Sequence, residues 1–224
     1  MSDVPGAVPI SHPISPGTAG ARPVHTRAEG PSDAIRAATR TYLRGESLDM
    51  SALAAELGIG RATLYRWVGN REDLLAAVLA EGTERTYRAA IKDAQGEGIA
   101  LVIDSMRRFM HSVLVTPALK ALTQREPLLF IRLATMPGAI EGRAARLVAE
   151  LLDQEAARGR IRLELPSPVM AQAIIRVCDS HLYAHLLGRN EPEIETALQL
   201  VELLLGDRQQ SGTAAASPDQ PLGS

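Results

Sequence analysis

The sequence predicts an all-α fold, and three features of the chain support this prediction. Apolar residues recur every three or four positions through most of residues 31–207, which is the spacing of one face of a helix. Capping residues, prolines and glycines stand where these stretches begin and end. Only the short segment RIRLEL, residues 160–165, alternates as a half-buried strand does, and we interpret it as an extended link.

Composition limits the classes of protein to consider. The 224 residues are 46% hydrophobic, which is enough for a sizeable core. A single cysteine, Cys178, excludes a disulfide within the chain. No long apolar run and no secretory signal is present, so we expect a cytoplasmic protein without membrane contact. Arginine provides 22 of the 24 basic residues, which together with heavy alanine use indicates a GC-rich, bacterial gene.

The chain divides into four segments. Residues 1–30 and 208–224 are rich in Pro, Gly and Ser and lack periodicity, so we predict two disordered tails. Residues 31–94 form the predicted N-terminal domain, which includes a linking helix from residue 70. Residues 95–207 form the predicted C-terminal helical bundle.

The ends of several helices are marked by specific residues. In the N-terminal domain Ser32 and Asp49 are the expected N-caps of the first two helices, and Asn70 with Asp73 resembles a capping box. The helices expected there span about residues 33–44, 50–57, 61–68 and 70–94.

The C-terminal domain has similar signals. Ser167 before Pro168 predicts one helix start, and Asn190 with Glu193 predicts a capping box at the last helix. The helices expected in this domain span about residues 99–115, 117–123, 126–136, 139–158, 168–187 and 191–205.

Residues 48–79 have the pattern of a helix-turn-helix. Two short helices meet at Gly58, which permits the left-handed backbone of a tight turn. The apolar residues spaced to pack between these helices are Leu53, Leu57, Leu64 and Val68. The second helix then presents a short, polar and basic face, as a helix lying in the major groove of DNA requires. The run from Gly58 to Arg71 has three arginines and no acid, although the whole chain has a net charge of -2.

This segment resembles the N-terminal domain of TetR-family transcriptional regulators. The resemblance lies in ALAAELGI, RATLYRWV, the polar step NRED and LLAAVL. Two departures are Gly60, where a serine cap is frequent, and Trp67-Val68, which replaces the common His-Phe pair. The resemblance implies a homodimeric DNA-binding regulator whose C-terminal domain holds a small-molecule pocket.

The residues predicted to contact DNA lie at the start of the second short helix and of the linking helix. Arg61 and Thr63 are expected at base edges, where an arginine can pair with guanine. Tyr65, Arg66 and Arg71 are expected on phosphates, and the alternative is that the arginines are solvated and Tyr65 is half-buried. The full predicted set is Arg61, Ala62, Thr63, Tyr65, Arg66, Asn70 and Arg71.

The C-terminal domain resembles the QsdR-type branch of this family in REPLLFIRLAT, GRIRLELP and LYAHLLGRNEPEIETALQLVELLL. This branch implies a lactone or acyl-chain signal as effector. Polar groups among apolar ones identify pocket candidates. They are Met106, Phe109, Met110, Phe130, Met136, Arg176, Asp179 and Tyr183. The alternatives are a core position for each Met and Phe, and a salt bridge between Arg176 and Asp179 across one helical turn.

Two helices have apolar faces that suit a dimer interface, and the pattern does not separate interface from core. We favour the last two helices of the chain, because a two-fold DNA reader needs a self-complementary face. The apolar residues on the two candidate faces are Leu147 and Leu151, and Leu198, Val201, Leu204 and Leu205.

We therefore expect a repressor without cofactor that leaves a palindromic operator when an effector moves the linking helix. The alternatives are an activator or a metal-responsive regulator of the same fold. The metal would bind at Cys178, His181 and His185, which share a helix face. A helical adaptor without DNA binding is a more remote alternative. No phosphate-binding glycine loop, Gly-x-Ser-x-Gly or His-Glu-x-x-His motif is present, so an enzyme is not expected.

Overall fold

The structure is a computed structural model that describes residues 28–135, 137–188 and 191–206. This part of the chain contains ten α-helices, a short 3-10 helix at Ala184–Leu187 and no strand, which confirms the all-α prediction. The helices are α1 Pro31–Leu43, α2 Met50–Glu56, α3 Arg61–Val68, α4 Arg71–Asp93, α5 Ile99–Val115, α6 Pro117–Arg125, α7 Pro127–Thr135, α8 Ala139–Ala157, α9 Ser167–Leu182 and α10 Ile194–Leu205. Residues 1–27 and 207–224, nearly all of the two predicted tails, lie outside the described residues.

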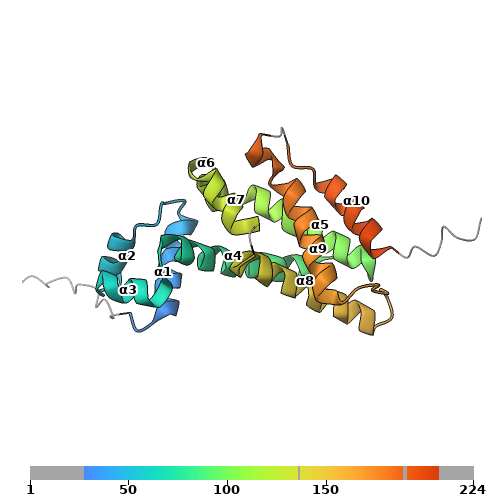
Figure 1. Ribbon diagram of the computed structural model, residues 1–224, viewed down its shortest axis with the longest axis horizontal. Helices are drawn as coiled ribbons and strands as arrows, with labels where there is room; N and C mark the ends of the chain where they lie inside the picture. The colour runs from blue at the N-terminus through green and yellow to red at the C-terminus, as the bar shows by residue number, and fades with distance from the viewer. Residues whose placement is uncertain (1–27, 136, 189–190, 207–224) are drawn as a thin grey trace, which may run out of the picture.

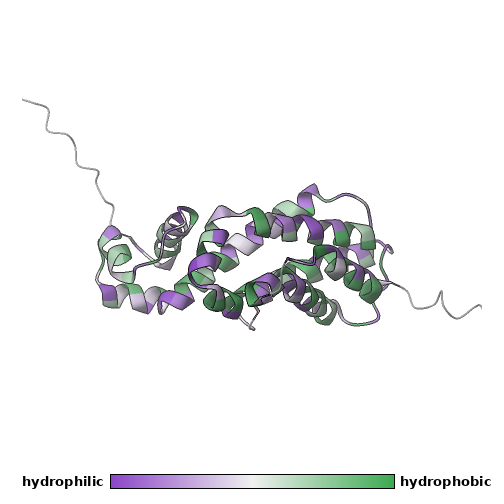
Figure 2. Ribbon diagram, turned by 90° about the horizontal axis from the view of Figure 1, so that it is seen from above, coloured by the Kyte–Doolittle hydropathy of each residue, from purple (hydrophilic) through white to green (hydrophobic). Residues whose placement is uncertain are grey.

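The helices form two groups joined by α4. Figure 1 shows α1, α2 and α3 gathered at one end of an elongated molecule, while α5 to α10 form a bundle at the other end. The long helix α4 runs from the first group into the bundle, where it packs on α5 and α8. Hydrophilic and hydrophobic residues alternate around most helices in Figure 2, as expected of amphipathic helices that bury one side. None of the described helices is both long and apolar enough to cross a membrane.

Two predicted caps of the N-terminal half are observed. The Asp49 carboxylate accepts hydrogen bonds from two backbone N–H groups at 2.7 and 3.0 Å and so caps α2. Asn70 and Asp73 form a complete capping box at the start of α4, since the side chain of each accepts the backbone N–H of the other. Gly58 has a φ of 66°, which is the left-handed conformation predicted for the turn between α2 and α3.

Three predicted helix starts are wrong. The first helix starts at Pro31 rather than after Ser32, because a proline with its fixed φ is already suited to the first helical position. In α9 Ser167 is itself helical and follows Pro166 as the N-cap, so it does not cap the helix. The last helix starts only at Ile194, after Glu193 as N-cap and without a side-chain capping bond; Asn190 lies outside the described residues.

The end of the long helix predicted at 168–187 also differs from the structure. The α-helix ends at Leu182, and a 3-10 helix continues the chain to Leu187 before Gly188 adopts a left-handed φ of 97°. Residues 160–165 form no strand and serve as a link between α8 and α9.

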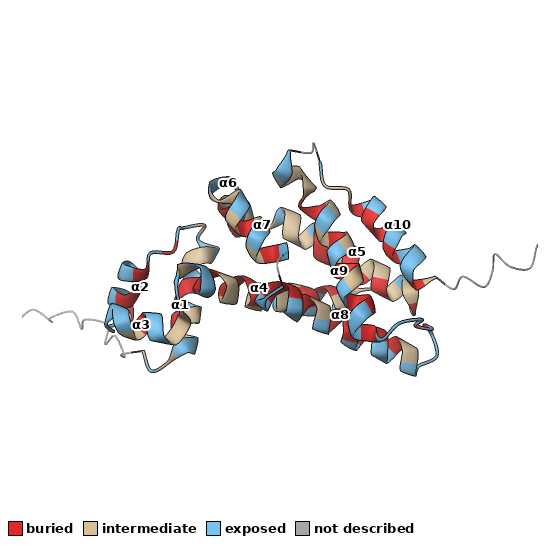
Figure 3. Ribbon diagram, in the orientation of Figure 1, coloured by how far each residue is buried: buried red, intermediate tan, exposed pale blue. Residues whose placement is uncertain are grey.

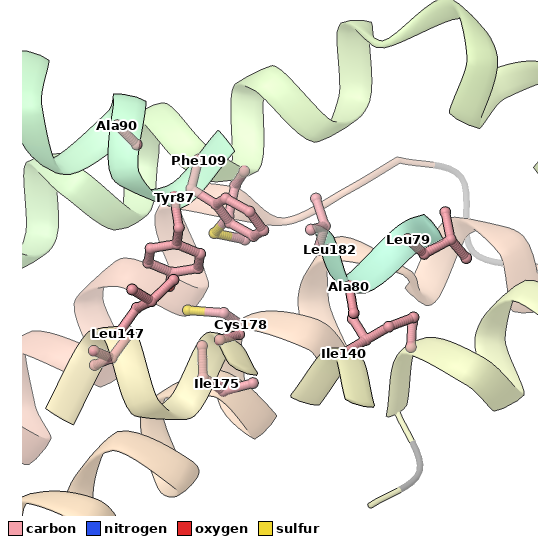
Figure 4. Packing of buried hydrophobic residues seen from close by; sticks show 14 of the residues in the cluster. Leu79, Ala80, Tyr87, Ala90, Phe109, Ile140, Leu147, Ile175, Cys178 and Leu182 are labelled. Atoms are coloured by element: carbon pink, nitrogen blue, oxygen red, sulfur yellow. The ribbon is translucent and has the colours of Figure 1, made fainter. Parts of the chain in front are cut away.

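The core centres on α4. Tyr87 is fully buried and stacks on Phe109 of α5, with ring centroids 4.1 Å apart. Figure 4 shows Tyr87 between Phe109 and Leu147 of α8, with Cys178 of α9 beside it. The four helices α4, α5, α8 and α9 thus share one core, which fixes the position of α4 relative to the bundle.

Candidate nucleic-acid interface and ligand cavity

The exposed face of α3 is short, polar and positively charged. Leu64 is fully buried and belongs to the same core as Leu53 and Leu57 of α2, as their spacing predicted. The opposite side of α3 is open to solvent, as the exposure pattern in Figure 3 shows. Its exposed residues are Arg61, Ala62, Tyr65 and Arg66, and Thr63 next to them is half-buried. The helical period therefore points the predicted DNA-contacting residues of α3 outward.

The two arginines of this face have no ion pair or hydrogen bond within the described part of the chain. The pKa of Asp49 lies below its usual value chiefly because the N–H groups of Ala52 and Ser51 donate to it, and the charge of Arg61 adds only the last contribution. The guanidinium groups of Arg61 and Arg66 are thus free to bind a phosphate or a base edge, with no ion pair to break first.

The two remaining candidates for DNA contact are already engaged in the structure. The Asn70 side-chain oxygen caps α4. Both terminal nitrogens of Arg71 donate to the Glu126 carboxylate, at 2.8 and 2.6 Å, and its Nε donates to the Leu48 carbonyl oxygen at 3.0 Å. The bond with Arg71 lowers the pKa of Glu126. A phosphate contact by Arg71 stays a prediction, and it would compete with this bidentate pair.

Arg71 is part of a larger contact between the two groups of helices, because Glu126 lies between α6 and α7. Nearby, Arg132 of α7 pairs with Glu72 of α4 at 2.5 Å. Arg125 of α6 donates to the carbonyl oxygen of Gly45, which follows α1, also at 2.5 Å. We call the set Arg71, Glu72, Arg125, Glu126 and Arg132, together with the Gly45 carbonyl, the interdomain contact.

A cavity of about 270 Å³ lies next to this contact. It is lined by seven helices or their ends, and its wall is mostly apolar. The apolar lining residues are Leu43, Leu79, Phe109, Val113, Leu119, Phe130, Ala134 and Ile140. The remaining lining residues are Tyr42, Gly82, Thr83, Arg85, Thr86, Thr116 and Tyr183. Phe130 and Tyr183 meet edge to face in this wall, with ring centroids 5.0 Å apart.

Three of the eight predicted pocket residues, Phe109, Phe130 and Tyr183, line the cavity. Burial in the apolar interior raises the pKa of Tyr183 well above its usual value, so this phenol is neutral in the protein. Met136 lies outside the described residues.

The other four predicted pocket residues do not line the cavity. Met106 and Met110 are fully buried core residues, and the Tyr87 hydroxyl donates to the Met106 sulfur. Arg176 donates to the buried carboxylate of Glu141 at 3.2 Å rather than to Asp179. Burial, with a smaller effect of Glu141, raises the pKa of Asp179 to about 8. Arg176 and Asp179 thus both lie near the Glu141 carboxylate, and neither lines the cavity.

One part of the cavity wall, contributed by α1 and α4, was not predicted from the sequence. Tyr42 and Leu43 belong to the end of α1, and five lining residues lie on α4, from Leu79 to Thr86. One signal could have identified this segment: Gly82 interrupts a helix interior, where glycine is unfavourable, and Thr83 and Thr86 follow at once. A Cβ added at Gly82 would meet no atom within 4 Å, so the glycine leaves open space beside the cavity.

The alternative metal site has no support in the geometry. Cys178 is buried, and burial raises the pKa of its thiol to about 12, which opposes the thiolate form that binds metal. The Nδ1 atoms of His181 and His185 lie 3.0 and 2.9 Å from backbone carbonyl oxygens of their own helical turns. Within the described residues no group of three or more His, Cys, Asp or Glu side chains is arranged to hold a metal ion.

The exposed face of α3 on a helix-turn-helix, joined by α4 to a bundle with its own cavity, is the architecture of a DNA-binding transcriptional regulator. Comparisons with known proteins identify the family. Residues 97–206 match the model of the tetracycline repressor-like C-terminal domain, close to the predicted domain 95–207. A comparison with curated protein sequences finds no match.

Two solved structures are similar over most of their length. The transcriptional repressor QsdR of the TetR family from R. erythropolis is 52% identical with a TM-score of 0.77, covering 78% of this chain and 93% of QsdR. The TetR-family repressor AlkX from Dietzia sp. strain DQ12-45-1b, implicated in biodegradation of n-alkanes, is 24% identical with a TM-score of 0.54, covering 80% and 95%. The likeness to AlkX concerns the fold alone.

The chain belongs to the TetR family of transcriptional regulators. This confirms the resemblance seen in the sequence, including that to the QsdR-type branch, and the expectation of a DNA-binding regulator rather than an enzyme.

Proposed function

We propose that the protein is a repressor that binds a palindromic operator as a homodimer and releases it when a small, partly apolar effector enters the cavity. The observation that carries this proposal is the origin of the cavity wall. Tyr42 and Leu43 come from α1 and Leu79 from α4, and both helices belong to the DNA-binding half. An occupant of the cavity therefore touches that half directly. The 52% identity to the repressor QsdR favours repression over activation.

A short path joins the cavity to the recognition helix α3. Only Gly69 and Asn70 separate the end of α3 from the start of α4. Leu79 and Gly82 stand two to three helical turns further along α4, roughly 12 to 17 Å from its start at 1.5 Å per residue. Because α4 is a continuous helix, a displacement at this depth also moves its first turn, and α3 with it.

The interdomain contact provides a second path. Leu119 of α6 and Phe130 of α7 line the cavity, and Glu126 lies between them in sequence. An effector that shifts α6 and α7 also shifts the carboxylate that holds Arg71 at 2.6 and 2.8 Å. Both paths end at the first turn of α4, so an effector changes the orientation of α3 by acting on either wall of the cavity.

The composition of the lining supports the proposed class of effector. Its wall is largely aliphatic and aromatic, with hydroxyl groups from Tyr42, Thr83 and Thr86. The volume of about 270 Å³ lies just below the range of roughly 300–1,000 Å³ that is usual for ligand pockets, which favours a small effector. A lactone or acyl-type signal combines an apolar chain with a compact polar group and fits this description.

We assign the dimer interface to α9 and α10. Leu200, Leu203 and Leu204 form an exposed apolar stripe on α10, and Leu203 alone is 74% exposed. Val169 on α9 is 51% exposed. Binding to a palindromic operator requires the dimer to present its two copies of α3 to successive major grooves, about 34–36 Å apart. Leu203→Glu should give a monomer in sedimentation analysis, with Glu202→Gln as the control on the same helix.

The test is a selection of duplex DNA from a random pool with the full chain at moderate salt, followed by titration of the selected site. We expect the selected site to be palindromic, and the affinity of the protein for it to fall steeply as salt is raised. Addition of an acyl-chain compound or a lactone should also lower this affinity. Absence of any sequence preference would overturn the proposal. If the effector instead tightens operator binding, the protein is a regulator that needs its effector to bind DNA. If zinc releases the operator, the metal-responsive alternative is favoured.

A further inference from the structure

The cavity wall has a single charged group among its described residues, the guanidinium of Arg85 on α4. No described Asp or Glu lines the cavity to balance this charge. Arg85 is exposed, and within the part of the chain that the structure describes it has neither an ion pair nor a hydrogen bond. One unpaired cation therefore stands at the edge of an otherwise apolar cavity.

Two neighbouring arginines, Arg88 and Arg143, do have an ion-pair partner. Glu84, the adjacent acid, binds Arg88 at 2.9 Å and Arg143 of α8 at 3.2 Å. Arg88 lies on another side of α4 and lines a groove toward α8 rather than the cavity. The acid next to Arg85 is thus used by two other arginines.

Hydroxyl groups of the lining add hydrogen-bonding groups to the cavity. The Thr86 and Thr116 hydroxyls donate to carbonyl oxygens of their own helices. The hydroxyls of Thr83 and Tyr42 have no such bond within the described residues. Burial raises the pKa of Tyr42 to about 12, so its hydroxyl keeps its proton and remains a donor. An anion at Arg85 would have hydrogen-bond donors from both α1 and α4 within the same lining.

We propose that the effector carries a carboxylate, which binds Arg85, while its apolar chain lies against Phe109, Val113 and Phe130. This inference builds on the proposed function, since it names the chemical class of the effector of that cavity. A carboxylate loses part of its hydration beside an apolar wall, and a charge-assisted bond to the cation at the edge offsets that loss. For a lactone-type signal, the ring-opened hydroxy acid is then the form that binds, and the neutral lactone is discriminated against.

The test compares pairs of probes of the same chain length, one charged and one neutral. Binding of octanoate and octanamide, and of 4-hydroxyoctanoate and its γ-lactone, is measured by calorimetry on the full-length protein. We expect each carboxylate to bind at least tenfold more tightly than its neutral partner. Higher salt should weaken the carboxylates and leave the neutral probes unchanged, because only the charged contact is screened.

Variants of α4 locate the effect. Arg85→Gln should reduce the preference for the carboxylate to about onefold, Arg85→Lys should restore part of it, and Arg88→Gln should keep it. Thermal unfolding of each variant shows whether it is folded. If neutral and charged probes bind equally to the unsubstituted protein and both release the operator, the inference is wrong and the proposed function stands. If no probe binds or releases the operator, the proposed effector class fails together with the inference.

Discussion

Arginine has different roles on α3 and at the start of α4. On the exposed face of α3, Arg61 and Arg66 have no partner within the described residues. In the interdomain contact, Arg71 holds Glu126 with two hydrogen bonds. The sequence places all three in one acid-free run, yet the fold leaves the first two without an ion pair and uses the third to join the two groups of helices. The difference shows that the charge of a local sequence run does not by itself predict which of its arginines are paired within the protein and which stay available to a partner.

The largest effect is expected for Arg61, one of the two α3 arginines without an ion pair in the described residues. Arg61→Ala should lower operator affinity by about 1–3 kcal/mol, or roughly five- to 150-fold, and relax the preference for one base pair, because a bidentate arginine–guanine contact would be lost. Fluorescence anisotropy with a panel of single-base operator variants measures this. Arg36→Ala is the matched control, since Arg36 is an exposed arginine of the same half that is paired with Asp33. Equal losses in both variants would contradict a base contact by Arg61.

Arg66→Ala should weaken all operator variants alike. A phosphate contact carries no sequence information, so its loss should reduce the slope of log affinity against log salt by about 1 and leave the base preference intact. The measurement is a salt titration with specific and random duplex. An unchanged slope would mean that Arg66 is solvated in the complex.

Glu126→Gln tests the pair between Arg71 and Glu126. Loss of the charge should weaken the interdomain contact and lower the free energy of unfolding by about 0.2–1 kcal/mol, as for other partly exposed ion pairs. The operator should still bind, but the drop in affinity caused by effector should become several-fold smaller, because one path of coupling is lost. Arg71 lowers the pKa of Glu126, so the pair stabilises the fold above the ordinary pKa of a glutamate, and this contribution disappears as the pH falls through the lowered pKa.

The control for this variant is Glu46→Gln, whose exposed pair with Arg44 lies within the DNA-binding half. If Glu46→Gln reduces the effector response as much as Glu126→Gln does, the interdomain contact has no special part in coupling.

The last prediction concerns the cavity wall that the two regions share, and there we expect the smallest change in operator binding. Gly82→Ala should raise the free energy of unfolding by about 0.5–1 kcal/mol, since alanine is favoured over glycine in a helix interior and its Cβ meets open space. The same methyl group narrows the cavity, so effector affinity should fall while operator affinity without effector stays the same. Chemical denaturation and calorimetry check both parts, and a stabilised variant with full effector affinity would show that Gly82 does not face the ligand.

The fold was largely predictable from local signals, whereas the cavity was not. Asp49 and Asn70 cap their helices as expected because a cap involves only residues a few positions apart. The period of α3 likewise identified which of its residues face outward. Met106 and Met110, by contrast, have the same chemical character as Phe109, and only the packing of α4 on α5 decides that they are core and Phe109 is wall. Tyr42 and Leu43 are far in sequence from the rest of the lining, so no local pattern connects them to it.

The shared wall of the cavity restricts how such regulators can be recombined. A chimera that joins residues 97–206 to the helix-turn-helix of another protein would keep the matched domain and lose Tyr42, Leu43 and the α4 residues of the lining. Its ligand cavity would then lack the part of the wall that α1 and α4 provide. Biosensor designs built on this scaffold should instead transplant α3 alone, leaving α1 and α4 in place, so that operator choice changes while chemical sensing is inherited intact.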